Sequence, residues 1–313
     1  MSVTDSIVLP TGMQVFQRGW LSSNNILLTG PDGNALVDSG YISHAAQTVA
    51  LVEHALNTVD PRRAQLDLLL NTHLHSDHCG GNAALQRRYG CRTLIPAAEA
   101  AKVREWNEDA LSFSATGQRC ERFGFDDTYA SGQTLQLGTL TWQALGAPGH
   151  DPHSLILYCA SEGILISADA LWEHGFGVIF PELDGESGFA ETAATLELIA
   201  SLAIRLVIPG HGAPFSDVKA ALSRAFARLE YLRADPVRNA QNGVKVLLKF
   251  LLLEHGRLAC GQIPQLLGGM RVFNQANQRF LQLTDADAAQ WASAQLVKVG
   301  AAELHGDWLV DRS

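Results

Sequence analysis

Residues 66–81 read LDLLLNTHLHSDHCGG and place three histidines and an aspartate directly after an apolar run. The leucine run is typical of a buried strand. His73 and His75 are two positions apart on extended backbone, so their side chains point to one side. Asp77 and His78 follow where the chain turns into a helix. Crowded imidazoles repel one another when protonated and leave lone pairs unsatisfied when buried and neutral, so this stretch predicts a metal site.

Three more residues of the same chemical kind occur at the ends of other apolar runs. His150 lies in GAPGHDPHS, Asp169 in ILISADAL and His211 in RLVIPGHG. Each one closes a β-like run and begins a loop, which is where an α/β protein places its functional groups. We therefore expect these three side chains to join those of the first stretch.

Composition and charge limit the classes of function. The chain has 313 residues, of which 47% are hydrophobic and 18% charged, as is ordinary for a globular enzyme. Its net charge of −9 is unevenly distributed. Residues 1–215 carry 11 Lys/Arg and 23 Asp/Glu, a net charge of −12. Residues 216–313 carry 12 Lys/Arg and 9 Asp/Glu, a net charge of +3. An acidic body is a poor match for nucleic acid. There is no apolar run of membrane-spanning length, the amino terminus has no pattern of a secretory signal, and the five cysteines never form a CxxC. We expect a cytoplasmic protein with reduced thiols and no membrane partner.

The pattern up to about residue 212 alternates β-like and helical segments, which favours an α/β layered architecture. Two apolar runs around the turn GPDG predict a hairpin, and helices are expected at 43–57 and 188–202. The weakly periodic region 108–133 is expected to be a surface excursion.

The remainder of the chain is mainly helical and ends in AAELHGDWLV, which is typical of a small hairpin. We therefore expect a catalytic domain at residues 1–215 and a helical module at 216–313 whose outline is winged-helix-like. This module either packs on the main domain or forms a homodimer contact; DNA binding is the alternative.

Taken together, HxHxDH, the later GH, the aspartate after an apolar strand and the final PGHG closely resemble the metallo-β-lactamase superfamily over about residues 12–215. The resemblance implies an α/β fold, a four-layer αβ/βα sandwich, with two metal ions in a cleft along its edge. Carried over to the matching positions, one metal's ligands are His73, His75 and His150, the other's are Asp77, His78 and His211, and Asp169 bridges the two.

The donor types suit two divalent metal ions. Imidazole nitrogens and carboxylate oxygens fit Zn²⁺, and they also fit Fe or Mn. A metal pair lowers the pKa of a shared water toward neutrality, so we expect hydrolysis by attack of a metal-bridging hydroxide. Asp77 is the candidate for accepting or relaying a proton.

The segment after Asp169 predicts the substrate pocket. Its text, ADALWEHGFGVIFPELDGE, is rich in aromatic residues and suggests a loop that roofs the cleft. The predicted pocket residues are Trp172, His174, Phe176 and Phe180, together with His153, which is three positions after His150. The alternatives are a loop whose aromatics only pack on the sheet, and a His153 that only caps the next element.

The bridging aspartate directs the functional interpretation. Members of the superfamily that hydrolyse β-lactams usually lack it, so the resemblance points to the glyoxalase II, lactonase and LACTB-like branch. Between Asp169 and Arg205 there is no Lys or Arg, which argues against a glutathione thioester. The leading hypothesis is a hydrolase of a thioester, ester or lactone of a small acyl substrate. A phosphodiesterase or nuclease that uses the same metals, and a mononuclear iron dioxygenase, are the alternatives.

Overall fold

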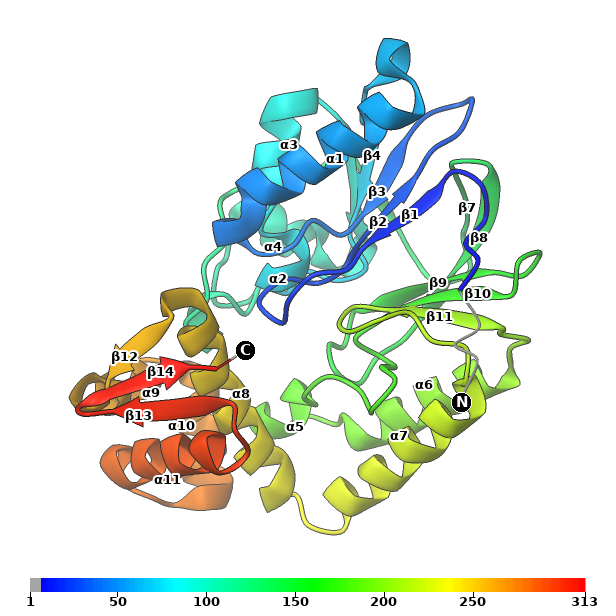
Figure 1. Cartoon of the computed structure of the whole chain (residues 1–313). Coiled ribbons are helices and arrows are strands. Elements are labelled where there is room, and N and C mark those ends of the chain that lie inside the picture. The colour runs from blue at the N-terminus through cyan, green and yellow to red at the C-terminus, as the bar shows by residue number, and fades with distance from the viewer. Residues whose placement is uncertain (1–6, 313) are drawn as a thin grey trace, which may run out of the picture.

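The computed structural model describes residues 7–312 and shows two stacked sheets with helices outside them (Figure 1). The first sheet has six strands in the order of the chain. They are β1 (Met13–Phe16), β2 (Asn25–Leu28), β3 (Ala35–Val37), β4 (Leu68–Leu70), β5 (Arg92–Pro96) and β6 (Asp127–Tyr129). The first three strands pair antiparallel and β3 to β6 pair parallel. The predicted hairpin around GPDG is the β2–β3 pair.

Both faces of this sheet are buried, which explains its continuous apolar runs. Successive side chains of a strand point to opposite faces. In β4, Leu69 belongs to the cluster formed with α1 (Ala45–Val59) and α3 (Asn82–Tyr89), whereas Leu70 belongs to the cluster between the two sheets. The leucine run before the histidines is therefore a central strand covered on both sides.

The second sheet has five strands in the order β11-β10-β9-β8-β7. Their bounds are β7 (Thr134–Leu137), β8 (Leu140–Gly146), β9 (Leu155–Cys159), β10 (Ile164–Ala168) and β11 (Leu206–Pro209). Its outer face is covered by α6 (Phe189–Ser201) and α7 (Val218–Arg233). The fully buried Trp142 of β8 packs in the core between the sheets. The layer order helix, sheet, sheet, helix confirms the predicted αβ/βα sandwich.

Short helical segments fill the connections. They are α2 (Ser76–Cys79), α4 (Ala100–Glu105), α5 (Phe180–Asp184) and the 3-10 turns Ile42–His44, Pro61–Arg63, Ala97–Glu99 and Ser114–Thr116. Region 108–133, expected to be a surface excursion, was predicted wrongly in part. Its last residues form β6, and Leu111, Phe113 and Phe123 are buried in a cluster with residues of α2 to α4. Their apolar side chains have no regular period, so the sequence pattern did not reveal this packing.

The C-terminal region is helical with a small sheet, as expected. Its elements are α8 (Val237–His255), β12 (Arg257–Ala259), the turn Cys260–Gln262, α9 (Ile263–Gly268), α10 (Arg271–Ala276), a π-helical turn (Asn277–Leu281), α11 (Asp285–Lys298), β13 (Ala302–His305) and β14 (Trp308–Asp311). The predicted hairpin is β13–β14, and β12 adds a third strand. The winged-helix likeness remains a prediction. Among the helices of residues 7–312, none has the length and apolar character that crossing a bilayer requires.

Helix α7 follows the predicted boundary at residue 215 and packs on the second sheet. Helix α7 buries Ala221, Ala225 and Leu229 in the cluster of the second sheet, whereas α8 contributes to another cluster that also includes Val178 and Leu183. A boundary after residue 215 therefore remains a prediction, and the packing places α7 with the sandwich.

Helix α8 is fixed to the sandwich by a buried carboxylate. The side chain of Glu254 is 4% exposed and accepts hydrogen bonds from the Tyr41 hydroxyl at 2.9 Å and from Arg119 Nε at 2.8 Å. The Tyr41 ring, fully buried, lies edge-on to Phe250 with centroids 5.1 Å apart. Burial and the Glu254 carboxylate raise the pKa of Tyr41, so the phenol is a donor at every physiological pH.

We expect Glu254→Ala to lower the free energy of unfolding by about 1–3 kcal/mol, because the buried Tyr41 hydroxyl loses its acceptor. Equilibrium urea denaturation measures this change. The matched control is Glu230→Ala on α7, which pairs with the exposed Arg233 and should stay within about 0.5 kcal/mol of the parent protein. Equal stability of the two variants would contradict an anchoring role for Glu254.

Candidate metal centre

The HLHSDH motif begins in the loop after β4 and continues into α2, at the edge of the sandwich. Extended backbone at His75 (ψ 148°) changes to helix at Ser76, so the histidines before the helix and the Asp77–His78 pair within it converge. Gly81 packs so closely on the first sheet that a Cβ there would lie 2.4 Å from the Ser39 carbonyl oxygen. The glycines that close the motif therefore let α2 approach the end of β3.

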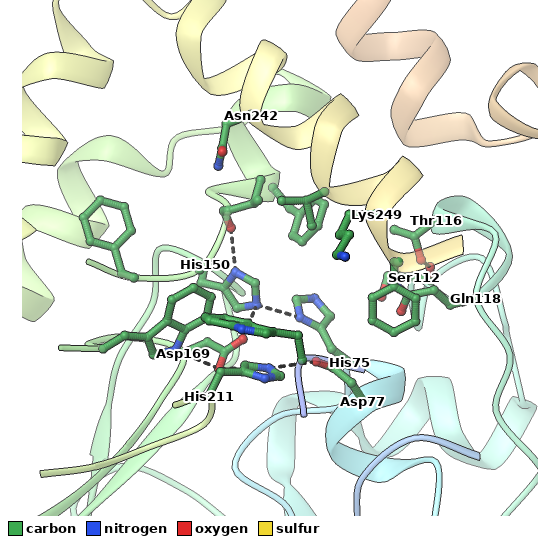
Figure 2. A pocket seen from close by; sticks show the side chains of 18 of the residues that line it. His75, Asp77, Ser112, Thr116, Gln118, His150, Asp169, His211, Asn242 and Lys249 are labelled. Atoms are coloured by element: carbon green, nitrogen blue, oxygen red, sulfur yellow. Dashed lines mark hydrogen bonds and ion pairs between the residues drawn. The ribbon is translucent and has the colours of Figure 1, made fainter. Parts of the chain in front are cut away.

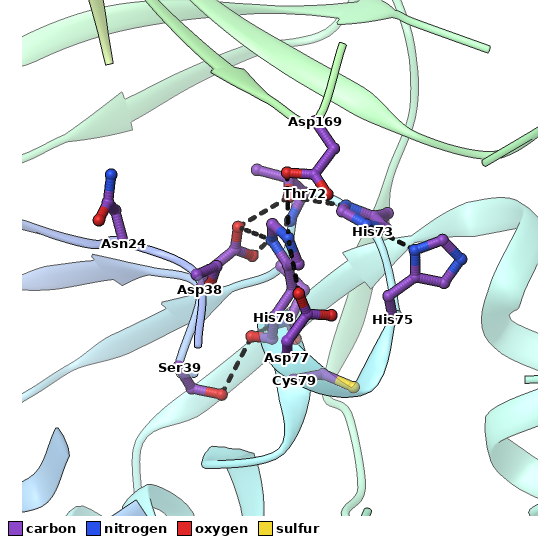
Figure 3. Close-up of polar contacts among 12 residues, drawn as sticks. Asn24, Asp38, Ser39, Thr72, His73, His75, Asp77, His78, Cys79 and Asp169 are labelled. Carbon is purple, nitrogen blue, oxygen red and sulfur yellow. Dashed lines mark hydrogen bonds and ion pairs between the residues drawn. The ribbon is translucent and has the colours of Figure 1, made fainter. Parts of the chain in front are cut away.

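His73, His75 and His150 form the first cluster; Figure 2 shows His75 and His150, and Figure 3 shows His73 beside His75. His73 Nε2 lies 3.1 Å from His75 Nδ1, and that atom lies 2.8 Å from His150 Nε2. His150 is held from behind, since its Nδ1 lies 2.6 Å from the Val178 carbonyl oxygen and donates to it. This hydrogen bond leaves Nε2 of His150 as the atom with a free lone pair.

The second cluster combines two carboxylates with two histidines; Figure 3 shows Asp77, His78 and Asp169, and Figure 2 shows His211. Asp77 Oδ2 lies 3.0 Å from His211 Nε2, and Asp169 Oδ1 lies 3.4 Å from His78 Nε2. The other oxygen of Asp169 is 3.3 Å from His150 Nε2 of the first cluster. Asp169 therefore lies between the two clusters, in the position expected of a bridging carboxylate.

The two clusters differ in their charge. Burial, together with neighbouring imidazoles, lowers the pKa of His73 and of His75, and it lowers the pKa of His150 to about 4. Burial also acts to lower the pKa of His78, but the carboxylates of Asp169, Asp38 and Asp77 raise it well above its ordinary value. One cluster is thus a group of neutral nitrogen donors, whereas in the other His78 is paired with carboxylates.

The arrangement fits divalent cations. Three imidazole nitrogens point at one another at hydrogen-bonding distance, and with neutral rings they cannot all be satisfied by donors within the cluster. His78 Nε2 is buried and has no hydrogen-bond partner among residues 7–312. A metal ion accepts lone pairs from several donors at once, and nitrogen and carboxylate oxygen are suitable ligands for Zn²⁺, Fe and Mn.

Asp38 is a functional residue that the sequence patterns did not reveal. It follows β3, is 2% exposed, and holds His78 from behind, with Oδ2 at 2.8 Å from Nδ1. It also accepts the Thr72 backbone N–H at 2.9 Å and the Thr72 hydroxyl at 2.8 Å. Its φ of 59° is strained for a residue other than glycine. The signal in the sequence was an aspartate that ends an apolar strand, as Asp169 does.

The backbone next to Asp169 is also irregular. The register of β10 against β11 shifts between Ile166 and Ala168, and Ala168 has a φ of 46°. A bulge of this kind turns the following side chain away from the strand's normal alternation. Here the turned side chain is Asp169, which is 4% exposed.

A cavity of about 360 Å³ opens from the two clusters. Of the predicted pocket residues, Trp172, Phe176 and Phe180 line it, and the Phe180 ring lies 5.5 Å from both His75 and His150. The structure does not bring His174 to this cavity. Its side chain is 79% exposed, in the turn closed by the Trp172–Gly175 bridge.

His153 is also absent from the cavity wall. Its Nδ1 contacts the buried carboxylate of Glu99, which is bound as well by Lys102 at 2.9 Å. The Glu99 carboxylate raises the pKa of His153. The direction of this side chain is set by a partner distant in sequence, which the local motif could not supply.

Three parts of the cavity wall were not predicted. Trp20 stacks on His211, with centroids 5.4 Å apart and planes at 10°. The segment expected to be a surface excursion adds polar groups, and α8 adds a largely apolar side. These lining residues are Ser112, Thr116 and Gln118 from the excursion, and Asn242, Val246, Lys249, Phe250 and Leu253 from α8.

An αβ/βα sandwich with a histidine- and aspartate-rich centre at its edge defines a class of metal-binding proteins. Comparison with known families agrees, since the sequence model of the metallo-beta-lactamase superfamily matches residues 18–211. The chain belongs to this superfamily, which confirms the resemblance inferred from the motifs. The match ends at His211, so it contains every residue of the two clusters.

Relatives with a stated activity are called hydroxyacylglutathione hydrolases. One from Chelativorans sp. (strain BNC1) is 31% identical over 113 residues, which are 36% of this chain and 37% of the relative. Those from Nitrobacter winogradskyi and Methylococcus capsulatus are 28% and 27% identical, over 49% and 54% of this chain and 52% and 56% of theirs. The chain thus spans about half the length of these relatives, or less.

Solved structures show the same fold at low identity. A metallo-beta-lactamase from Cronobacter sakazakii superposes with a TM-score of 0.58 at 19% identity, covering 73% of this chain and 96% of that one. A metallo-beta-lactamase family protein from Thermus thermophilus gives a TM-score of 0.56 at 21% identity. It covers 97% of this chain and 100% of its own, so the likeness of fold extends to the C-terminal region.

We expect Asp38→Ala to lower the affinity for divalent metal by about 10–100-fold, because His78 loses the carboxylate that fixes its ring. Metal titration followed by calorimetry measures the affinity. The matched control is Asp67→Ala, whose carboxylate accepts the Asn34 N–H at an exposed site, and this variant should bind metal as the parent does. Unchanged affinity in Asp38→Ala would show that His78 does not depend on this carboxylate.

Proposed function

We propose that the protein is a metal-dependent hydrolase that cleaves a thioester, ester or lactone of a small acyl substrate. One observation carries this proposal: seven nitrogen and oxygen donors converge at the base of a cavity whose remaining wall is mostly apolar. Such a cavity offers an acyl chain an apolar surface next to a polar reacting centre.

The proposed ligands are the side chains predicted from the sequence. His73, His75 and His150 would hold one ion, Asp77, His78 and His211 the other, and Asp169 both, with Zn²⁺ as the first candidate. A bound pair of divalent ions supplies a water of lowered pKa as nucleophile and positive charge beside the oxygen of the scissile carbonyl.

The protein's own residues orient the Asp169 carboxylate and exclude water from the centre. Trp172 Nε1 donates to Asp169 Oδ1 at 3.3 Å, so the roof of the cavity is tied to the carboxylate between the clusters. The Phe180 ring packs against His75 and His150 and keeps that side of the centre dry. Water exclusion strengthens electrostatic interactions in the site.

Asp77 is the proposed proton acceptor. Its carboxylate lines the cavity and accepts a hydrogen bond from His211 Nε2. Burial acts to raise the pKa of Asp77, but His78 and His211 outweigh this effect and lower it. An ionised carboxylate on the cavity side can take a proton from an attacking water and pass it to the leaving group.

The names of the relatives support acyl hydrolysis. They are called hydroxyacylglutathione hydrolases, and those from Nitrobacter winogradskyi and Methylococcus capsulatus match about half of this chain. Their substrate is not carried over, because the roof segment between Asp169 and Arg205 has no Lys or Arg of its own.

The test combines metal analysis with a substrate panel. We expect purified protein to bind about two equivalents of divalent metal by mass spectrometry of the ions, and to hydrolyse thioesters or lactones faster than bis-p-nitrophenyl phosphate. Cleavage of the phosphate alone would replace this proposal with the phosphodiesterase alternative. Oxygen consumption with one bound iron would replace it with the dioxygenase.

We expect Asp169→Ala and His150→Ala each to reduce kcat/KM by at least about 10³-fold, because each removes a donor from the reacting centre. Circular dichroism should show the fold retained, and ion analysis should show metal lost. His54→Ala is the control, since His54 is exposed on α1 far from the motif in sequence. Near-normal activity in either donor variant would refute the site assignment.

A further inference from the structure

Arg228 lies at the cavity wall, and among residues 7–312 neither it nor Lys245, which precedes the lining residue Val246, has a counterion. Arg228 of α7 lines the cavity, and Lys245 of α8 is close enough to it that the guanidinium helps to lower the pKa of the lysine. Both side chains are half-buried. Residues 170–204, which roof the same cavity, contain no Lys or Arg, so these helices supply a charge that the roof does not.

The guanidinium of Arg228 has neither an ion pair nor a hydrogen bond with any of residues 7–312. Its neighbours on α7 are partnered, since Arg224 Nε donates to the Glu173 carbonyl oxygen at 2.8 Å and Arg233 Nη1 binds Glu230 at 2.9 Å. Arg228 instead lies over the Phe176 ring, with Cζ 5.1 Å from its centroid. Burial lowers the pKa of Arg228, because the charged guanidinium loses solvation at this position.

The local backbone makes room for this guanidinium. Gly175 has a φ of 132°, and a Cβ there would lie 2.9 Å from Arg228 Nη1. A side chain at position 175 would push the guanidinium aside. The turn of the roof, the Phe176 ring and α7 therefore together fix the Arg228 head at the cavity wall.

Lys245 contrasts with the next lysine on its helix in the same way. Lys249 Nζ is satisfied by Asp311 Oδ1 at 2.5 Å and by the Ala301 carbonyl oxygen at 2.9 Å. Within the part of the chain that the structure describes, Lys245 has no such partner, and burial and Arg228 lower its pKa. Two neighbouring cations without a carboxylate repel each other and are costly to bury unless an anion joins them.

We propose that Arg228, assisted by Lys245, binds an anionic group of the substrate, so that the enzyme selects acyl esters or thioesters that carry a carboxylate, sulfonate or phosphate. The assignment of the anion to a substrate rests on the proposed function. The anion site itself rests on the position of Arg228 at the cavity wall. A planar guanidinium stacked on an aromatic ring can still donate two parallel hydrogen bonds to such a group.

The first test measures binding without catalysis. The probes are 8-anilinonaphthalene-1-sulfonate and N-phenyl-1-naphthylamine, which differ only in the sulfonate, titrated by fluorescence into the metal-loaded protein. We expect Arg228→Gln to weaken binding of the sulfonate probe about tenfold or more and to leave the neutral probe unchanged. Lys245→Gln should weaken it less, and Arg228→Lys should restore part of the loss.

Lys219→Gln is the matched control, because it removes one positive charge from an exposed position on the same helix. Three outcomes would overturn the proposal. The first is an unchanged affinity of Arg228→Gln for the sulfonate probe. The second is an equal loss of affinity for both probes, which would mean that Arg228 only shapes the cavity. The third is an equal loss of affinity in Lys219→Gln, which would mean a long-range charge effect.

The second test separates the two sources of the anion. One pair of substrates is the 4-nitrophenyl half-ester of adipate and its methyl ester, with the charge on the acyl part. The other is the hexanoyl thioester of 2-mercaptoethanesulfonate and that of ethanethiol, with the charge on the leaving group. One of the two pairs carries its charge on the same part of the molecule as the natural substrate. In that pair, Arg228→Gln should raise KM for the charged member about tenfold with little change in kcat. A parallel fall in kcat for the charged and neutral members would overturn the proposal.

Failure of the two proposals can be distinguished. If no substrate of the panel is hydrolysed by the metal-loaded protein, the proposed function fails, while a sulfonate-selective loss in Arg228→Gln still establishes the anion site. If esters are hydrolysed but the sulfonate makes no difference to binding, the anion site fails and the hydrolase assignment stands.

Discussion

The structure depends on the compensation of carboxylates that the fold has removed from water. Asp38, Asp77 and Asp169 are all less than 10% exposed and lie within one group of side chains. Burying a carboxylate is costly unless it is paired and hydrogen-bonded. His78 compensates two of them directly, through Asp38 at 2.8 Å and Asp169 at 3.4 Å. Imidazole nitrogens and carboxylate oxygens gathered this closely are suitable ligands for divalent cations, so the folded centre fits metal.

The two-sheet architecture stabilises the protein enough to tolerate this concentration of polar groups. Strands β4, β10 and β11 are apolar along their length because both of their faces are covered. Their packing stabilises the sandwich, and their ends open at one edge, where His73, Asp169 and His211 follow. These three donors are held rigidly, because each is one to three residues from the end of a buried strand. The strained φ values of Asp38 and Ala168 occur at this same edge.

Sequence patterns predicted the parts of the molecule that local chemistry decides. The layered fold and the convergence of donors followed from apolar runs that end in His or Asp, although the role of these donors as ligands remains a prediction. Asp38 ends such a run too, but a lone aspartate after a strand more often only begins a turn. His153 was placed at the cavity because it follows His150 by three positions, and His174 because it lies in the aromatic segment after Asp169. The direction of the His153 side chain depends on its contact with Glu99, and that of His174 on an exposed turn. The residues next to each histidine in sequence do not predict these directions.

The side of the cavity formed by α8 links the C-terminal region to the choice of substrate. Val246, Phe250 and Leu253 line the cavity, and the next residue, Glu254, is the anchor that binds Tyr41 of the sandwich. A shift of α8 would therefore change the apolar wall and displace Lys245 relative to Arg228, because the wall residues and Lys245 share one helix. Divergence in this docking contact would alter selectivity without touching any residue of the metal clusters. The C-terminal region is thus part of the site's wall, and its sequence carries information about the substrate that the HxHxDH motif does not.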